Sequence, residues 1–185
     1  MLQVDMPSAL RTVFGKGAMR QLRMKDNIPG IVYNRGEETL ALQFDFGRLH
    51  KDLLFIHGSN AVVTLQIDGD SKDKRHVLVQ EIQQDPVTDR VIHVDFLEIE
   101  LEQPRNFKVP LEFTGTAQGV ELGGVLKIFK NIIHLRGCPL DIPDTITADI
   151  TELEQGGPGL TFGDLEVPER IDMLDNAEVT CVTVY

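Results

Sequence analysis

Apolar residues along this chain mostly recur at every second position, which is the spacing of half-buried β-strands. Runs of this kind occupy residues 28–33, 40–44, 62–67, 77–82 and 90–97, and in the second half 109–113, 124–135, 145–150 and 177–185. Between them, the pair Asp68 and Gly69 and the segment 84–89 have the composition of turns. The pattern therefore predicts a mainly β protein.

One segment in the first half has helical spacing instead. Residues 15–26 place Lys16, Arg20 and Arg23 at i, i+4 and i+7, so these cations share one face of a helix. The apolar residues of the segment lie on another face: Ala18, Met19 and Leu22. We therefore expect a short helix with one basic side.

A second helix can begin at Asp45, which is a good capping residue, and run to about Phe55. Its apolar positions share one face: Leu49, Leu53 and Ile56. The order of elements predicts an antiparallel sheet curled into a β-barrel, with these two short helices inserted, over residues 1–100. A predominantly β domain follows over residues 101–185, after a polar, proline-containing linker at 100–105.

Charge is distributed unevenly along the chain. The net charge is −11, yet residues 11–35 contain six basic residues and one acid. Residues 1–100 contain 12 basic and 15 acidic residues, whereas residues 101–185 contain 6 and 14. A concentrated positive segment in an acidic protein indicates a localised anionic partner, and nucleic acid is the first candidate.

Composition excludes several other classes of protein. The chain is 42% apolar and 25% charged, which is typical of a globular protein and not of a disordered one. No apolar run approaches the roughly 20 residues that span a bilayer, and the first residues lack the pattern of a signal peptide. We therefore expect a soluble cytoplasmic protein without membrane contact. Cys138 and Cys181 lie in apolar contexts and are expected to be buried, reduced thiols, with a disulfide or a reactive thiol as the alternative.

The basic helix is a candidate phosphate-binding surface. Its three cations form a stripe roughly 10 Å long, and Gly15 and Gly17 would let backbone N–H groups approach a phosphate closely. A solvated basic face explains the same pattern. The glycines do not match a phosphate-binding loop, because no Gly-Lys-Ser/Thr sequence follows them.

Residues 92–96 alternate strictly, so His93 and Asp95 share the outer face of a strand while Ile92, Val94 and Phe96 point inward. Such a pair can orient an imidazole or hold a metal, but it is also the pattern of a surface histidine beside an acid. No nucleophile stands out, and the five histidines are dispersed: His50, His57, His76, His93 and His134. We therefore expect neither an enzyme nor a metal or other cofactor, and no small-molecule substrate.

Tyr33 is one of two tyrosines and lies within the basic segment. A partly exposed ring there can stack on a base or ribose. A tyrosine packed at the end of the barrel is the equal alternative.

These features occur together in a recognisable order. The first half contains Arg11 and then GKGAMRQLR (15–23), IPGIVYN (28–34), IQQDP (82–86) and HVDF (93–96). The second half contains VPLEFTGTAQGVELGGVL (109–126), DIPDTITADIT (141–151) and FGDLEVPE (162–169). The set resembles the bacterial large-subunit ribosomal protein L twenty-five family, in its longer, two-domain general stress protein Ctc form.

The resemblance implies a structural protein of the large ribosomal subunit that binds 5S rRNA, through a distorted minor groove and phosphates, as a monomer beside other ribosomal components. Carried over by position, the RNA-binding residues are Arg11, Lys16, Arg20, Arg23, Tyr33, Gln83, His93 and Asp95. The sequence departs from the family pattern at Met19, Gln21 and Gln84. Each departure removes a polar or phosphate contact that the family often has.

The acidic second half does not have the charge of an RNA surface, and we expect it to meet protein neighbours. A stress-related protein-interaction β-module is the alternative function, with the basic segment facing an acidic protein. A hydrolase or metal enzyme built on His93 and Asp95 is a third class, which stoichiometric metal in the purified protein would support.

Overall fold

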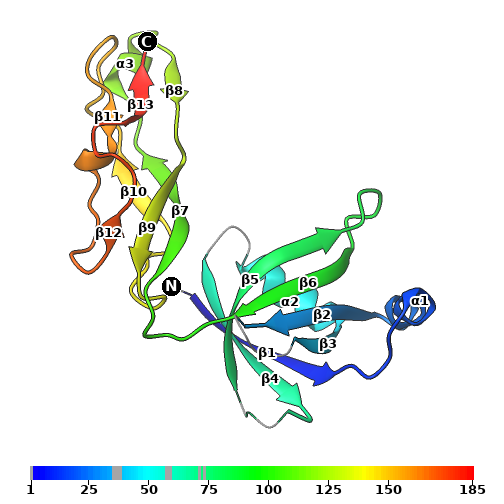
Figure 1. Cartoon of the computed structure of the whole chain (residues 1–185). Helices are drawn as coiled ribbons and strands as arrows, with labels where there is room; N and C mark the ends of the chain where they lie inside the picture. Colours follow the sequence, from blue (N-terminus) through cyan, green and yellow to red (C-terminus); the bar gives the residue numbers. More distant parts are fainter. Residues whose placement is uncertain (1, 35–38, 57–59, 71, 73) are drawn as a thin grey trace. The chain divides into compact units, whose positions relative to one another are not determined.

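The computed structural model divides into two compact units (Figure 1). It describes residues 2–34, 39–56, 60–70, 72 and 74–185. One unit comprises Leu2–His57 and Ala61–Leu101, and the other consists mainly of Glu102–Tyr185. Both units are built mostly from strands, which confirms the predicted fold class. No helix in the described part of the chain is long and apolar enough to cross a membrane.

The first unit is a closed six-stranded barrel with the strand order β1-β3-β2-β6-β5-β4. Its strands are β1 (Leu2–Leu10), β2 (Asn27–Tyr33), β3 (Leu40–Asp45), β4 (Ala61–Asp68), β5 (Arg75–Gln84) and β6 (Val91–Glu98). Alternate side chains fill the interior, where the rings of Phe44 and Phe96 pack with centroids 5.4 Å apart. Burial of this apolar surface is the main stabilising contribution to the barrel.

Two features of the barrel differ from the prediction. Strand β1 was not predicted, although its sequence alternates: Met6 lies in the core with Leu2, Val4 and Leu10 packed against it, while Asp5 is exposed. The sheet is also mixed and not antiparallel, because β1 pairs parallel to β4 and β2 pairs parallel to β6. The alternation of side chains fixes which face is buried, but it carries no information on the direction of a neighbouring strand.

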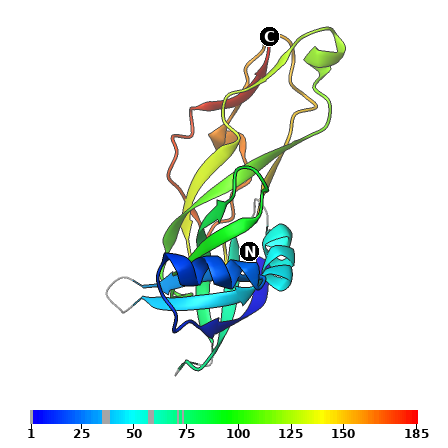
Figure 2. The same ribbon diagram turned by 90° about the vertical axis from the view of Figure 1, so that its right-hand side faces the viewer.

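The two predicted helices are present in the barrel unit. Helix α2 (Phe46–Ile56) follows β3 directly, and the backbone N–H of Arg48 donates to the Asp45 carboxylate at 3.0 Å. Its buried residues are those of the predicted apolar face: Leu49, Leu53 and Ile56. Helix α1 (Lys16–Met24) is slightly shorter than predicted. It contacts β2 at one end of the barrel and is drawn in dark blue in Figure 2.

Gly30 allows three barrel strands to pack closely. A Cβ atom at this position of β2 would lie 2.8 Å from the Phe44 ring and 2.8 Å from the carbonyl oxygen of Val94. Real Cβ atoms do not approach other heavy atoms so closely. The glycine between Pro29 and Ile31 therefore has a packing role in the barrel that holds the candidate site.

The second unit contains a four-stranded and a three-stranded sheet, with orders β10-β7-β9-β12 and β11-β13-β8. The strands are β7 (Arg105–Thr114), β8 (Leu126–Ile128), β9 (Ile132–Gly137), β10 (Ile146–Asp149), β11 (Leu160–Thr161), β12 (Asp172–Met173) and β13 (Thr180–Val184). Two short helical segments are α3 (Gln118–Glu121) and a 3-10 turn at Phe162–Asp164. Cys181 is buried and Cys138 half-buried, and both are free thiols.

One predicted strand of this unit is wrong. Residues 124–135 do not form a single strand, because they divide into β8 and β9, which belong to different sheets. The chain turns where the N–H groups of Phe129 and Lys130 both donate to the carbonyl of Cys181, at 2.8 and 3.1 Å. This contact joins residues far apart in sequence, so the local apolar pattern could not reveal the break.

Candidate nucleic-acid interface

Helix α1 carries the basic face and has little support from the protein core. None of its nine residues is buried, and its first residue follows Gly15, whose φ of 95° favours glycine. Among the described residues, no side chain caps the first turn, and no acidic residue lies in it. The N-terminal end of α1 therefore presents backbone N–H groups that no described side chain satisfies, together with the positive end of the helix dipole.

The three cations of the basic face have different surroundings. Lys16 and Arg20 are exposed, whereas Arg23 is half-buried. The Nε atom of Arg23 donates to the carbonyl oxygen of Ile92 at 3.1 Å. Lys16 and Arg20 are thus available to an external anion, while Arg23 also joins the helix to β6.

Arg11 lies just after β1 and is committed to contacts inside the protein. Its Nε donates to the carbonyl of Leu42 at 3.3 Å, and its Nη1 contacts the carbonyl of Val13 and the sulfur of Met19, at 3.0 and 3.1 Å. The guanidinium also lies 5.1 Å from the centroid of the Phe14 ring. Partial burial lowers the pKa of Arg11, although arginine stays charged at neutral pH. Arg11 therefore ties the segment before α1, and α1 itself, to the barrel.

Met19 is one of the departures from the family pattern noted above. Its thioether accepts the Nη1 contact from Arg11 at 3.1 Å. A sulfur is a weak acceptor, so the methionine positions Arg11 without providing a polar group for RNA.

The outer face of β2, β6 and β5 gathers four more candidates from separate parts of the sequence. The register pairs Gln83 of β5 with His93 of β6, and Tyr33 of β2 with Leu97. Since directly paired residues point to the same side of a sheet, Gln83, His93, Asp95 and Tyr33 share one surface. Sequence positions 33, 83, 93 and 95 thus meet on three adjacent strands.

Irregular pairing between β5 and β6 shapes this surface. The register shifts between Val79 and Glu81 and again between Gln83 and Gln84. Beyond the first shift, residues 80–84 are all exposed, although alternate side chains point to opposite faces of the strand. Bulges of this kind increase the local twist and re-aim side chains, and here the extended end of β5 presents Gln83. The Nε2 of Gln83 donates to the carboxylate of Glu81 at 3.1 Å.

His93 and Asp95 form a close pair at the centre of this face. Nδ1 of His93 and Oδ1 of Asp95 are 2.6 Å apart, and each side chain is 21% exposed. The angles do not meet those of a hydrogen bond, and both atoms are buried without a hydrogen-bond partner among the described residues. Buried polar atoms of this kind require an explanation. The close contact between the two side chains provides part of one, since an imidazole and a carboxylate at this distance attract each other.

Arg90 is a further cation at this end of the barrel that the sequence did not single out. Its Nη2 lies 2.8 Å from the Asp26 carboxylate, and its guanidinium lies 4.6 Å from the centroid of the Phe46 ring. It lines a small pocket of about 120 Å³ together with Arg23 and Thr88. Its position in the sequence, between the 84–89 turn and the HVDF strand, was the feature that could have identified Arg90 as a candidate.

The described residues contain no group of three or more histidine, cysteine or acidic side chains that could hold a metal ion. His57 and Arg35, which belong to the histidine set and the basic segment of the sequence, lie outside the described residues. His93 and Asp95 therefore stand as a pair and not as part of a metal site within the described chain.

Comparison with known proteins shows which family this chain belongs to. Residues 8–96 match the model of the ribosomal L25p family, and these residues include all eight candidates. The chain is 42% identical over 187 residues to the large ribosomal subunit protein bL25 of Desulfotalea psychrophila, covering all of this chain and 99% of that protein. The chain belongs to the ribosomal L25p family.

The L25p relationship extends through both units. Residues 104–185 match the C-terminal domain of ribosomal protein TL5. Proteins named bL25 from Halothermothrix orenii and Nitratidesulfovibrio vulgaris are 35% and 36% identical to the chain, which covers 83% and 91% of their lengths. The resemblance read from the sequence is confirmed, and membership of this ribosomal family bears out the expectation that the chain is not an enzyme.

Proposed function

We propose that this L25p protein is a structural component of the large ribosomal subunit that binds 5S rRNA through one side of its barrel. The interface would combine the exposed cations of α1 with the outer face of β2, β6 and β5. A ribosomal protein acts in the cytoplasm, and the chain would work there as a monomer beside neighbouring ribosomal components.

The observation that carries this proposal is the coexistence of two chemically different surfaces on one barrel. Lys16 and Arg20 are exposed on a helix whose N-terminal N–H groups lack side-chain caps, which suits phosphates. The strand face holds Gln83, His93 and Asp95, which can read base edges or 2′-hydroxyl groups. A carboxylate near phosphates is repelled, so Asp95 suits a site only as an acceptor from a base amino group or a 2′-hydroxyl.

The roles of the eight candidates differ under this proposal. Lys16 and Arg20 neutralise phosphates, and Tyr33 packs against a ribose or base. Arg11 and Arg23 hold α1 against the barrel through backbone carbonyls, at 3.3 and 3.1 Å, so that the helix keeps its orientation toward the RNA. Their remaining guanidinium N–H groups would face the same phosphates.

A gel-shift titration of the purified chain with 5S rRNA, in excess tRNA, tests the proposal. We expect binding that survives the tRNA and weakens with salt, with a slope of about −0.7 to −0.9 per phosphate neutralised. Arg20→Ala should reduce the magnitude of this slope by about the contribution of one neutralised phosphate. Lys108→Ala is the matched control, because Lys108 is an exposed cation of the second unit.

Loss of 5S rRNA binding in the presence of excess tRNA would contradict specific recognition of 5S rRNA. An unchanged salt slope in Arg20→Ala would remove α1 from the interface. In the first case, ribonuclease-resistant association with protein partners would favour the protein-interaction module instead.

A further inference from the structure

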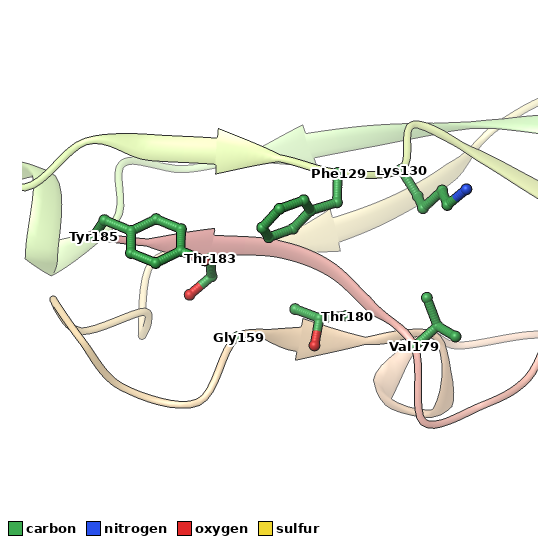
Figure 3. Close-up of a pocket in the computed structure, with 7 residues that line it drawn as sticks. All are labelled: Phe129, Lys130, Gly159, Val179, Thr180, Thr183 and Tyr185. Carbon is green, nitrogen blue, oxygen red and sulfur yellow. The ribbon is translucent and has the colours of Figure 1, made fainter.

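The second unit contains a shallow groove along β13 that the proposed RNA interface does not use. Its volume is about 500 Å³, and Figure 3 shows the side chains that line it. Two exposed aromatic rings border it, Phe129 after β8 and Tyr185 after β13. The rings meet edge to face with centroids 6.5 Å apart. Exposed aromatic rings beside a groove are typical of an interaction site.

The charge around the groove is opposite to that of the unit. Residues 101–185 contain 14 acidic and 6 basic residues. The segment 122–140 nevertheless has no acidic residue and three basic ones, and residues 179–185 carry no charged side chain. These two segments supply all the described lining residues except Gly159, and none of the lining residues is acidic.

One lysine lies at the aromatic rings, and a second lines the groove. The Nζ atom of Lys127 lies 5.2 Å from the centroid of the Phe129 ring and 5.4 Å from that of Tyr185. Lys130 lines the groove directly. Two of the six cations of this acidic half of the chain therefore stand at one apolar surface.

The floor of the groove is closely packed. A Cβ atom on Gly159 would lie 2.5 Å from the carbonyl of Val182 and 2.6 Å from Cγ2 of Thr180, so only glycine fits there. The hydroxyl groups of Thr180 and Thr183 add polar positions along β13. The groove thus combines close packing at Gly159, an apolar wall, and two cations that line it or lie beside its rings.

We infer that this groove binds an extended protein segment that carries apolar side chains and one or two carboxylates. The apolar side chains would bury the exposed rings, and the carboxylates would pair with Lys127 and Lys130. Single-stranded RNA is the less suited occupant. Its affinity comes from neutralising many phosphates, and two lysines in a unit of net charge −8 offer too few cations.

The experiment uses large ribosomal subunits that lack this protein. It therefore rests on the proposed function, under which the protein is a component of that subunit. The full-length chain competes with a charge-reversed variant, K127E/K130E, for incorporation into these subunits. We expect the variant to be incorporated at least fivefold less well, while its affinity for 5S rRNA stays within twofold of that of the unmodified chain. K108E/R136E is the matched control, since it changes the charge equally at exposed positions of the other sheet.

A photo-crosslinking amino acid at Thr183 identifies the occupant in the reconstituted subunits. A cross-link to a protein segment with acidic and apolar residues supports the inference. A cross-link to rRNA, no cross-link, or equal incorporation of the two charge-reversed variants overturns it. Failure of the unmodified chain to bind 5S rRNA would instead contradict the proposed function, and the two failures are therefore distinguishable.

Discussion

The arginines near α1 differ in what they contact, and this decides what each can do. Arg11 donates to the carbonyl of Leu42 and contacts Met19, and Arg23 donates to the carbonyl of Ile92. Arg20 is exposed. Replacing Arg11 or Arg23 would therefore displace the helix as well as remove a charge, whereas replacing Arg20 removes a charge from an otherwise intact surface.

Asp95 provides a test of recognition that does not depend on phosphate attraction. Because its carboxylate would accept from a base or a 2′-hydroxyl, Asp95→Ala should reduce the preference for 5S rRNA over tRNA about tenfold, in keeping with one lost base contact. The slope of affinity against salt should change little. Competition gel shifts measure both quantities. Glu112→Ala, an exposed acid of the second unit, is the control, and an equal loss of affinity for every RNA would refute the role of Asp95.

The two thiols should react at very different rates. Burial raises the pKa of Cys181 to about 11, so about one thiol in a thousand is ionised at pH 8. In Cys138→Ser, iodoacetamide should therefore label the folded chain very slowly and the denatured chain readily. Labelling followed by mass spectrometry measures this, with Cys181→Ser as the control. Fast labelling of folded Cys138→Ser would show that the β13 core opens.

Helix α1 owes its position to a few polar contacts and to partial burial of one side. With no buried residue and no side-chain cap, nine residues form a helix too short to be stable alone. An anion at its N-terminal end would add to its stability. RNA binding would therefore stabilise α1, the element that carries the basic face.

The substitution Gly17→Ala should change the stability of α1 and its RNA binding in opposite directions. No described atom outside the helix backbone and the neighbouring residues lies within 4 Å of a Cβ atom at this position, so Gly17→Ala should stabilise the chain by about 0.5–1 kcal/mol through helix propensity. If phosphates approach the helix backbone here, the same change should weaken 5S rRNA binding several-fold. Urea unfolding and gel shifts measure the two effects.

Gln21→Ala is the matched control for this substitution, because Gln21 is exposed in the same helix but away from its N-terminal end. It should leave RNA binding nearly unchanged. A Gly17→Ala chain that binds as tightly as the unmodified one would exclude close backbone contact at this turn.

At the scale of the whole molecule, the two units have different charges. Residues 1–100 have a net charge of −3 and include the basic segment, whereas residues 101–185 have a net charge of −8. The strong negative charge of the second half opposes contact with RNA. We therefore propose a division in which the barrel binds RNA and the second unit meets protein.

Cleavage between the units tests this division. A protease site inserted after Gln103 lies between β6 and β7. We expect the barrel fragment to bind 5S rRNA within twofold of the full chain and each fragment to unfold cooperatively in calorimetry. The uncut chain with the inserted site is the control. A barrel fragment that loses its cooperative transition would show that the second unit is needed for its folding.

The sequence alone determined the mainly β class, the two helices of the barrel, the basic face of α1 and the family. The fold class, the helices and the basic face follow from local patterns, since alternation, helical spacing and capping depend on neighbouring residues. The family follows from the ordered set of short motifs. The Asp45 cap and the buried face of α2 formed as predicted, because both are contained within one short segment.

Only the tertiary structure decided which distant residues act together. The parallel pairing of strand β1, the division of residues 124–135 between two sheets, and the internal contacts of Arg11 all depend on partners far away in the sequence. The same holds for the surface shared by Tyr33, Gln83 and His93 and for the groove at Phe129 and Tyr185. Strand register and long-range hydrogen bonds fix these arrangements, and neither is encoded in a local pattern of apolar and polar residues.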